Sequence, residues 1–173
     1  KGIFFVPTEF IDLQDTNKQN EFITQNIFDG DAQNPEILPD MQPLTWEDLE
    51  YLLTQGHIIG SHSRNHKRLS SIHSQKDLYD EIIESGDILE RKLRIPITHF
   101  AYPFGDIGSI SRQAMKLILE RYTYCFSGIR GENRFPIVRH AMLRDSISVD
   151  DTLYYTQLIV EKALDPIYWK KIK

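Results

Sequence analysis

The chain has 173 residues, which is a usual length for one domain, and apolar residues make up 40% of it, enough for a buried core. A net charge of −5 argues against nucleic acid as the main partner, because a phosphate backbone requires a clustered basic surface. No apolar run is long enough for a membrane span, and the single cysteine, Cys125, is expected to be a buried structural thiol without a disulfide partner.

The first residues predict a strand followed by a long polar segment. The apolar residues 2–6, bounded by Pro7, are typical of a buried strand. Residues 12–43 are rich in Asp, Asn, Gln and Pro, which predicts a loop insertion with a short helix near residues 20–28. Because the sequence starts directly in a core strand, we expect it to be a fragment of a longer domain.

From Thr45 onward, helices and strands are predicted to alternate. Thr45 is the expected N-cap of a helix that ends at Gly56, and residues 57–60 follow as a strand. Helices are then expected over residues 74–94, 111–121 and 149–164, and strands over residues 98–102, 122–127 and 136–143. This alternation predicts an α/β fold with a mainly parallel sheet, closed or partly closed, and with catalytic residues at the C-terminal strand ends.

Two histidines, His62 and His66, stand directly after the second predicted strand. Histidines four residues apart can converge on one metal ion if they share a helical turn. Neutral imidazole suits zinc, and also cobalt or nickel. The spacing alone is a weak signal, since a pair of solvated or core histidines would look the same, but the end of a strand is the active-site face of an α/β barrel.

Residues 44–66 resemble the second motif of the polysaccharide deacetylase family. The likeness combines the helix start Leu-Thr-Trp-Glu-Asp with the later run Gly-His-Ile-Ile-Gly-Ser-His-Ser-Arg-Asn-His. In that family, both histidines of the motif bind the catalytic metal. The resemblance therefore implies that His62 and His66 are ligands of a divalent ion, with zinc as the expected ion and cobalt or nickel as alternatives.

A second stretch, Phe-Ala-Tyr-Pro-Phe-Gly at residues 100–105, is similar to the third motif of that family. The resemblance implies that the loop walls the substrate groove with Tyr102, Pro103, Phe104 and Gly105. It also implies that the backbone N–H of Phe104 stabilises an oxyanion. Ala101 stands where many members have an arginine, so the orienting role of that arginine falls elsewhere or is absent. A plain strand and turn is the alternative interpretation.

Residues 137–140, Ile-Val-Arg-His, more weakly resemble the late strand of the family. In some members a histidine at the end of this strand is the general acid, which would make His140 the group that protonates the leaving amine. Arg139 could instead face the site as an orienting residue. A strand histidine that is satisfied by hydrogen bonds is the alternative.

The first motif of the family, T-F-D-D-G, is expected upstream of Lys1. It carries the general base and the third metal ligand, both aspartates. The resemblance therefore implies a distorted or incomplete (β/α) barrel in which residues 1–173 form a single domain without the strand and helix that carry this motif. Four aspartates are stand-ins that no spacing marks: Asp29, Asp31, Asp40 and Asp106. Two histidines alone make a poor divalent site, so the chain by itself could be inactive.

By resemblance, the expected function is metal-dependent hydrolysis of N-acetyl groups from the amino sugars of a polysaccharide or cell-surface glycan. The first alternative is an inactive carbohydrate-binding relative that keeps the groove aromatics Trp46, Tyr102 and Phe104. The second is a hydrolase of another carbon–nitrogen bond, such as a cyclic amide or formamide. The likeness favours a bacterial envelope or extracellular setting, with the cytoplasm as the alternative, and leaves the oligomeric state open.

Overall fold

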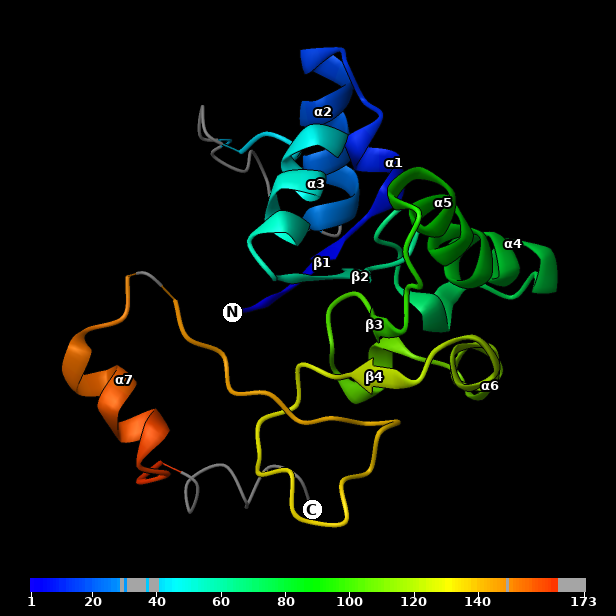
Figure 1. Cartoon of the computed structure of the whole chain (residues 1–173). Coiled ribbons are helices and arrows are strands. Elements are labelled where there is room, and N and C mark those ends of the chain that lie inside the picture. The colour runs from blue at the N-terminus through cyan, green and yellow to red at the C-terminus, as the bar shows by residue number, and fades with distance from the viewer. Residues whose placement is uncertain (29, 31–36, 38–40, 149, 165–173) are drawn as a thin grey trace.

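In the described part of the chain, four parallel strands form one sheet in the order β1-β2-β3-β4 (Figure 1). The computed structural model describes residues 1–28, 30, 37, 41–148 and 150–164. The strands are β1 (Ile3–Val6), β2 (Ile58–Ser61), β3 (His99–Ala101) and β4 (Tyr124–Phe126). Each strand pairs with the next one along the chain, so right-handed crossovers bring the intervening helices to one face. The predicted α/β fold with a parallel sheet is confirmed.

Helices fill the connections between the strands. They are α1 (Thr8–Ile11), α2 (Thr16–Phe22), the π-helical η1 (Ile23–Ile27), α3 (Trp46–Thr54), the 3-10 turn η2 (Leu69–Ser71), α4 (Gln75–Tyr79), the π-helical η3 (Asp80–Glu84), α5 (Ser85–Leu93), the 3-10 turn η4 (Ile107–Ser109), α6 (Arg112–Arg121) and α7 (Leu153–Val160). The side chains of Thr45, Ser74 and Ser111 each accept a backbone N–H at a helix start, which confirms the N-cap expected at Thr45.

The hydrophobic core lies between the sheet and the helices. Alternate strand residues point to the helix side, where Ile59, Phe100 and Cys125 are almost fully buried. The helical segment over residues 75–93 buries an apolar stripe against the sheet, and its residues Ile82 and Leu89 have no exposed surface. This packing fixes the strands, and therefore the loops that follow their C-terminal ends.

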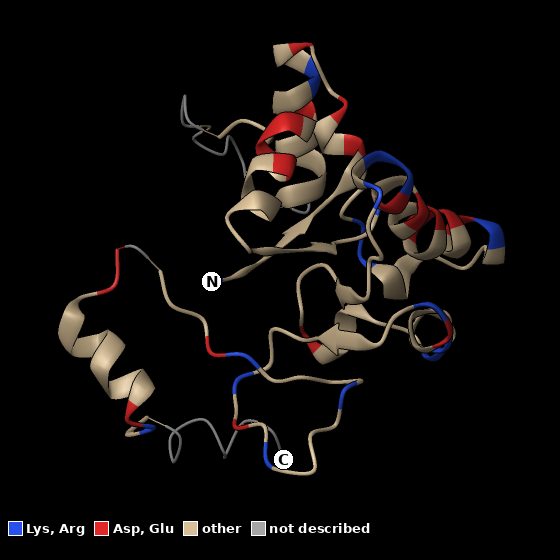
Figure 2. Cartoon of the chain, viewed as in Figure 1, with Lys and Arg blue, Asp and Glu red and all other residues tan. Residues whose placement is uncertain are grey.

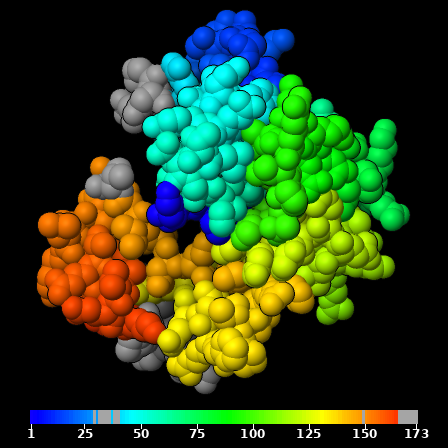
Figure 3. All heavy atoms as spheres, viewed as in Figure 1, coloured from blue at the N-terminus to red at the C-terminus, as the bar shows by residue number. Residues whose placement is uncertain are grey.

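The opposite face of the sheet carries aromatic rings. Phe5 and Phe126 have ring centroids 5.1 Å apart, and His99 stacks on Tyr124 at 4.8 Å. The chain after β4 leaves the sheet as a long irregular segment that ends at α7, away from the other helices (Figures 1 and 3). This face therefore has no helix layer of its own within the described part of the chain.

The prediction of a strand over residues 136–143 is wrong. This segment forms a single bridge, between Met142 and Phe126. The N–H of Cys125 in β4 donates to the carbonyl of Arg139, and the carbonyl of Cys125 accepts from the N–H of Met142. These two partners are one residue further apart in the sequence than in a regular parallel ladder. Pro136 has no N–H to donate, and the neighbouring Phe135 is 93% exposed, so neither a continuous ladder nor burial supports a strand here.

Two other boundaries differ from the prediction. The short helix expected near residues 20–28 begins at Thr16, because the side chain of Asp15 caps the N–H of Lys18, and it continues through η1. The last helix is shorter than predicted and is limited to Leu153–Val160. Most of residues 29–40 lie outside the described residues, as does Val149. Among the helices that are described, none is both long and apolar enough to cross a membrane.

Candidate active site

His62 is held at the C-terminal end of the sheet by three strands. It directly follows β2, its backbone N–H donates to the carbonyl of Val6 in β1 (3.1 Å), and its ring Nδ1 lies 2.7 Å from the carbonyl of Ala101 in β3. A carbonyl only accepts, so Nδ1 carries the proton. The lone pair of the neutral ring is therefore on Nε2, the tautomer that a metal ligand of this kind uses.

His66 is held in the same way by a different element. Its ring Nδ1 lies 2.8 Å from the carbonyl of Asn26 in η1, and its backbone N–H donates to Ser63 Oγ at 3.0 Å. Asn26 is in the last turn of its helical segment, where carbonyls lack a partner in the helix. The polar segment that the sequence suggested as an insertion thus supplies the acceptor that sets the tautomer of His66.

The two imidazoles lie next to each other, with ring centroids 4.8 Å apart and planes at 78°. They do not share a helical turn, which was the arrangement that the four-residue spacing suggested. A tight loop brings them together instead, with Ser63 (φ 64°) and His66 (φ 55°) in the left-handed region that non-glycine residues rarely adopt. Backbone strain of this kind is concentrated at functional sites.

Glu81 fixes the loop that carries the two histidines, and the sequence analysis did not identify it. Its carboxylate is 3% exposed and accepts the backbone N–H groups of Arg64 (3.1 Å) and Asn65 (2.8 Å) and the Asn65 side-chain amide (2.8 Å). The signal in the sequence is a charged residue three positions after the buried Leu78, on the apolar side of its helix. A buried carboxylate needs such donors, and here the loop provides them.

Burial controls the charge of His62. Burial, as the largest cause, and the neighbouring His66 together lower the pKa of the ring from 6.5 to about 4, although the hydrogen bond to Ala101 opposes the shift. Arg144 adds a smaller lowering effect. His62 is therefore neutral at pH 7, which is the form that binds a metal ion.

The loop after β3 packs against the start of the chain that follows β4. The hydroxyl of Tyr102 donates to the carbonyl of Gly105 at 3.0 Å, and the side chains of Tyr102 and Pro103 are buried. Gly105 has φ 71°, and a Cβ there would lie 2.4 Å from the N atom of Gly128. Only glycine fits this position. Of the four predicted groove residues, only Phe104 therefore combines side-chain exposure with a place beside the histidines.

Phe104 lies against the histidine pair. Its ring centroid is 5.0 Å from that of His66, and the guanidinium carbon of Arg68 lies over the Phe104 ring, 4.3 Å from the ring centroid. Phe104 itself has φ 64°. Its backbone N–H makes no hydrogen bond to any residue in the described ranges. Asp106, one of the predicted stand-in acids, forms an ion pair with Arg68 at 3.0 Å.

Three other predicted residues lie elsewhere. His140 is exposed in a turn, and the guanidinium carbon of Arg139 lies 5.5 Å from the ring centroid of Tyr124. No hydrogen bond or ring contact within the described part of the chain joins either residue to the histidine pair. Trp46 packs in the helix layer, where its indole N–H donates to Asp12 at 2.8 Å. The aspartates at positions 29, 31 and 40 lie outside the described residues.

The donor set fits a metal ion in part. His62 and His66 offer imidazole nitrogens from rings that backbone carbonyls orient, which suits zinc. Across the ranges that the structure describes, no cluster of three or more His, Cys, Asp or Glu residues could hold an ion. A catalytic zinc site normally has three protein ligands, of which these two residues would supply two.

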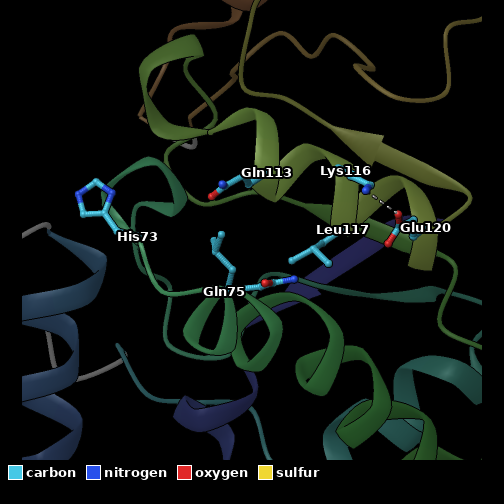
Figure 4. Close-up of a pocket in the computed structure, with 7 residues that line it drawn as sticks. His73, Gln75, Gln113, Lys116, Leu117 and Glu120 are labelled. Carbon is cyan, nitrogen blue, oxygen red and sulfur yellow. Dashed lines mark ion pairs between the residues drawn. The ribbon is translucent and has the colours of Figure 1, made fainter.

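A separate cleft lies outside this site, between α4 and α6 (Figure 4). It has a volume of about 470 Å³ and is lined by His73, Gln75, Leu78, Gln113, Lys116, Leu117 and Glu120. Within it, Lys116 and Glu120 form an exposed pair one helical turn apart (3.9 Å). The cleft contains neither histidine of the pair, so it is not the candidate active site.

Comparison with known proteins identifies the family. The family profile described as "Polysaccharide deacetylase" matches residues 2–120. This chain belongs to the polysaccharide deacetylase family. The match includes the histidine pair and the loop at Phe104, and it ends before the segment that follows β4. Comparison with curated proteins found no match.

Solved polysaccharide deacetylases share the fold. The Streptococcus pyogenes deacetylase PplD, in complex with acetate, is 17% identical over 70% of this chain and 52% of its own, with a TM-score of 0.60. BC0361, a polysaccharide deacetylase from Bacillus cereus, is 17% identical over 91% and 50%, also at 0.60. A de-N-acetylase from Aggregatibacter actinomycetemcomitans is 14% identical over 91% and 64%, at 0.62. The present chain thus spans about half to two thirds of these structures, which supports the distorted barrel as its fold.

Proposed function

We propose that this chain forms part of a metal-dependent hydrolase that removes N-acetyl groups from the amino sugars of a polysaccharide or cell-surface glycan. One observation carries the proposal. Two adjacent imidazoles, His62 and His66, are each fixed by a backbone carbonyl on Nδ1, which leaves Nε2 as the ligating nitrogen of both rings. A family whose members act on polysaccharides is the natural setting for such a pair.

In this proposal, His62 and His66 bind a divalent ion, with zinc favoured and cobalt or nickel as alternatives. Such an ion supplies Lewis acidity and lowers the pKa of water. The protein contributes the orientation of both rings, and burial keeps His62 neutral so that it remains a ligand at pH 7. Glu81 and the strained loop fix the spacing of the two rings.

The loop of residues 102–105 contributes the oxyanion donor. The N–H of Phe104 donates to the oxygen of the acetamide as negative charge develops on it, and a fixed backbone donor needs no reorganisation at that moment. Tyr102 and Gly105 hold the turn that presents this N–H. Removal of one such donor typically costs about 10²–10³ in rate.

Proton transfer requires two further groups. The leaving amine needs an acid, for which we retain His140, with Arg139 as the orienting residue, although the segment that carries both would have to approach the pair. A carboxylate base and a third ligand must come from residues other than the described ones. Asp29, Asp31 and Asp40 of this chain, or a segment upstream of Lys1, would supply them.

A second candidate is a catalytically inactive, carbohydrate-binding relative. The observation that favours it is the absence of a three-residue ligand group among the described residues. The two candidates differ in whether acetate is released, because a binding domain would retain glycan affinity without turnover.

The experiment is an assay of acetate release from N-acetylglucosamine oligomers by the full-length protein with added zinc or cobalt. The variants His62→Ala and His66→Ala should each abolish release, whereas His73→Ala, an exposed histidine of the separate cleft, should leave it unchanged. Unchanged release by both pair variants would contradict the metal assignment. Glycan binding without any release by the wild type would favour the second candidate.

A further inference from the structure

The side chain of Arg68 connects the two loops that form the candidate active site. Arg68 follows His66 in the loop after β2, and its guanidinium reaches the loop after β3. There it forms an ion pair with Asp106 at 3.0 Å, and its central carbon lies over the Phe104 ring, 4.3 Å from the ring centroid. The Phe104 ring therefore contacts both the guanidinium and the His66 ring, whose centroid is 5.0 Å away.

Both ends of this connection are anchored through their backbone. The carbonyl of Arg68 accepts the backbone N–H of Ser71 at 3.0 Å and the Ser71 hydroxyl at 2.7 Å. The carbonyl of Asp106 accepts the backbone N–H of Ser109 at 3.2 Å and its hydroxyl at 2.7 Å, and Ser109 has no exposed surface. The loops therefore set the backbone positions of both partners. Stacking on Phe104 also orders the arginine side chain, which limits the entropic cost of the ion pair.

The backbone at Phe104 requires support of this kind. Phe104 has φ 64° and Gly105 has φ 71°, so two successive residues adopt the left-handed conformation, which only glycine adopts without steric cost. The angle φ describes rotation about the N–Cα bond, so it sets the direction of the N–H relative to the side chain. Contacts that hold the Phe104 ring therefore help to fix the direction of its N–H. Arg68 and His66 provide these contacts.

We propose that Arg68 is a positioning residue for the Phe104 N–H and that Asp106 is its partner in this role. The inference rests on the proposed function, in which this N–H donates to the acetamide oxygen. The guanidinium holds the loop of residues 102–105 against the histidine pair and does not contact the reacting atoms itself. An oxyanion donor acts only within hydrogen-bonding distance of the developing charge, so a displacement of about 1 Å can cost about 10²-fold in rate. Asp106 thus has a role other than that of the stand-in acid that the sequence suggested.

The variants remove the parts of the connection one at a time. Arg68→Gln removes the charge and the planar guanidinium, whereas Arg68→Lys keeps a cation that can pair with Asp106. Asp106→Asn removes the negative charge with little change of shape. Figure 2 shows basic and acidic positions interspersed on α5 and α6, and Arg91 of α5 forms an exposed ion pair with Glu84 at 2.7 Å. Arg91→Gln is therefore the matched control for the loss of an arginine–carboxylate pair.

The first measurement is acetate release from N-acetylglucosamine oligomers by the full-length protein with zinc. Arg68→Gln and Asp106→Asn should each lower kcat by about 10- to 100-fold, because the donor is displaced in the transition state. KM and the affinity for zinc should change by less than about twofold. The double variant should lose no more than the weaker single variant, since the two residues act as one unit. Arg68→Lys should recover part of the rate, and Arg91→Gln should match the wild type.

The second measurement does not require activity. In the chelator-treated protein, nuclear Overhauser contacts between the ring protons of Phe104 and His66 report whether the loop stays against the histidine pair. We expect these contacts in the wild type and in Arg91→Gln, as the 5.0 Å separation of the two ring centroids requires. They should be weakened or lost in Arg68→Gln and in Asp106→Asn. Without detectable acetate release by the wild type, the proposed function fails, and this measurement alone decides on the positioning role.

Full ring contacts between Phe104 and His66 in Arg68→Gln would overturn the proposal, as would an unchanged kcat. A loss that appears in KM or in zinc affinity instead of kcat would also overturn it, because the residue would then serve binding and not the orientation of the donor. Thermal unfolding checks that each variant is folded. If Arg68→Gln does not fold, Asp106→Asn carries the test with the same expected results, because it changes the shape of the side chain least.

Discussion

Glu81 illustrates how single residues set up the candidate site. A carboxylate that is 3% exposed would be unstable without donors, and three N–H groups of the histidine loop provide them. The same contacts hold Ser63 and His66 in left-handed conformations that isolated residues avoid. The free energy gained by satisfying Glu81 therefore helps to stabilise the strained loop.

Glu81→Gln should destabilise the protein by about 1.5–3 kcal/mol, because hydrogen bonds to a charged group are replaced by weaker neutral ones and one amide hydrogen is left without an acceptor. Glu84→Gln is the matched control, since Glu84 makes a more exposed ion pair with Arg91 and should cost about 0–1 kcal/mol. Urea unfolding measures both. Equal costs for the two variants would show that Glu81 does not hold the loop.

The pKa of His62 predicts how stability depends on pH. Its pKa is about 4 in the folded, metal-free protein and about 6.5 when the chain unfolds, so the unfolded state binds the proton first as the pH falls. The stability contributed by the neutral ring is complete above pH 6.5 and is lost as the pH falls toward 4. Urea unfolding of the chelator-treated protein between pH 7 and 4 should show this loss, and His62→Gln should show a smaller one.

At the scale of elements, π-helical turns place acceptors where the site and the core need them. η1 ends with the carbonyl of Asn26 directed to His66, and in η3 the carbonyl of Ile82 accepts from the hydroxyl of Tyr122 at 2.6 Å. Local widening of a helix frees carbonyls that a regular helix would use internally, which is why such turns are often found at functional positions.

Gly86 allows the close approach of α5 to Tyr122. A Cβ at position 86 would lie 2.4 Å from the Tyr122 hydroxyl oxygen, so Gly86→Ala should displace that hydroxyl from Ile82 and destabilise the protein by about 1–3 kcal/mol. The double variant Gly86→Ala/Tyr122→Phe removes the clashing oxygen. Its cost should be smaller than the sum of the two single costs, and simple additivity in urea unfolding would contradict this packing.

The sequence predicted most elements because their local signals agree with the fold. The cap at Thr45 lies where it was predicted, and the helices expected from residues 74 and 111 begin there, with Ser74 and Ser111 as their N-caps. The strand at residues 136–143 could not be predicted correctly, since a run with apolar residues looks the same whether it is buried or exposed. Convergence of His62 and His66 was predictable, but not its cause, because Asn26 and Glu81 are distant in sequence and act through the tertiary structure.

At the scale of the whole molecule, the sheet has one face packed against helices and one face that carries the aromatic and charged groups of the candidate site. Consecutive strand order produces this asymmetry, since every crossover covers the same side. In a barrel the other face becomes the interior, and the strand ends lead to the active site. The family match covers residues 2–120, which include the first three strands of this sheet and the histidine pair.

Cys125 reports on the integrity of the whole core. It is 1% exposed at the centre of β4, and burial raises the pKa of its thiol to about 12. A thiol reagent should therefore react with the native protein very slowly at pH 8, and the rate should rise with urea in parallel with global unfolding. Rapid reaction without urea would show that the helix-covered face opens independently of the rest.

The most direct measurement is the ¹⁵N chemical shift of the ring nitrogens of His62 and His66, recorded by NMR before and after addition of zinc. Without metal, both rings should carry a proton on Nδ1, as their contacts to Ala101 and Asn26 require, and His62 should be neutral at pH 7. Zinc should then shift Nε2 of both rings together, with one ion per chain. Protonated Nε2 in either ring, or a shift in only one of them, would contradict a shared metal site.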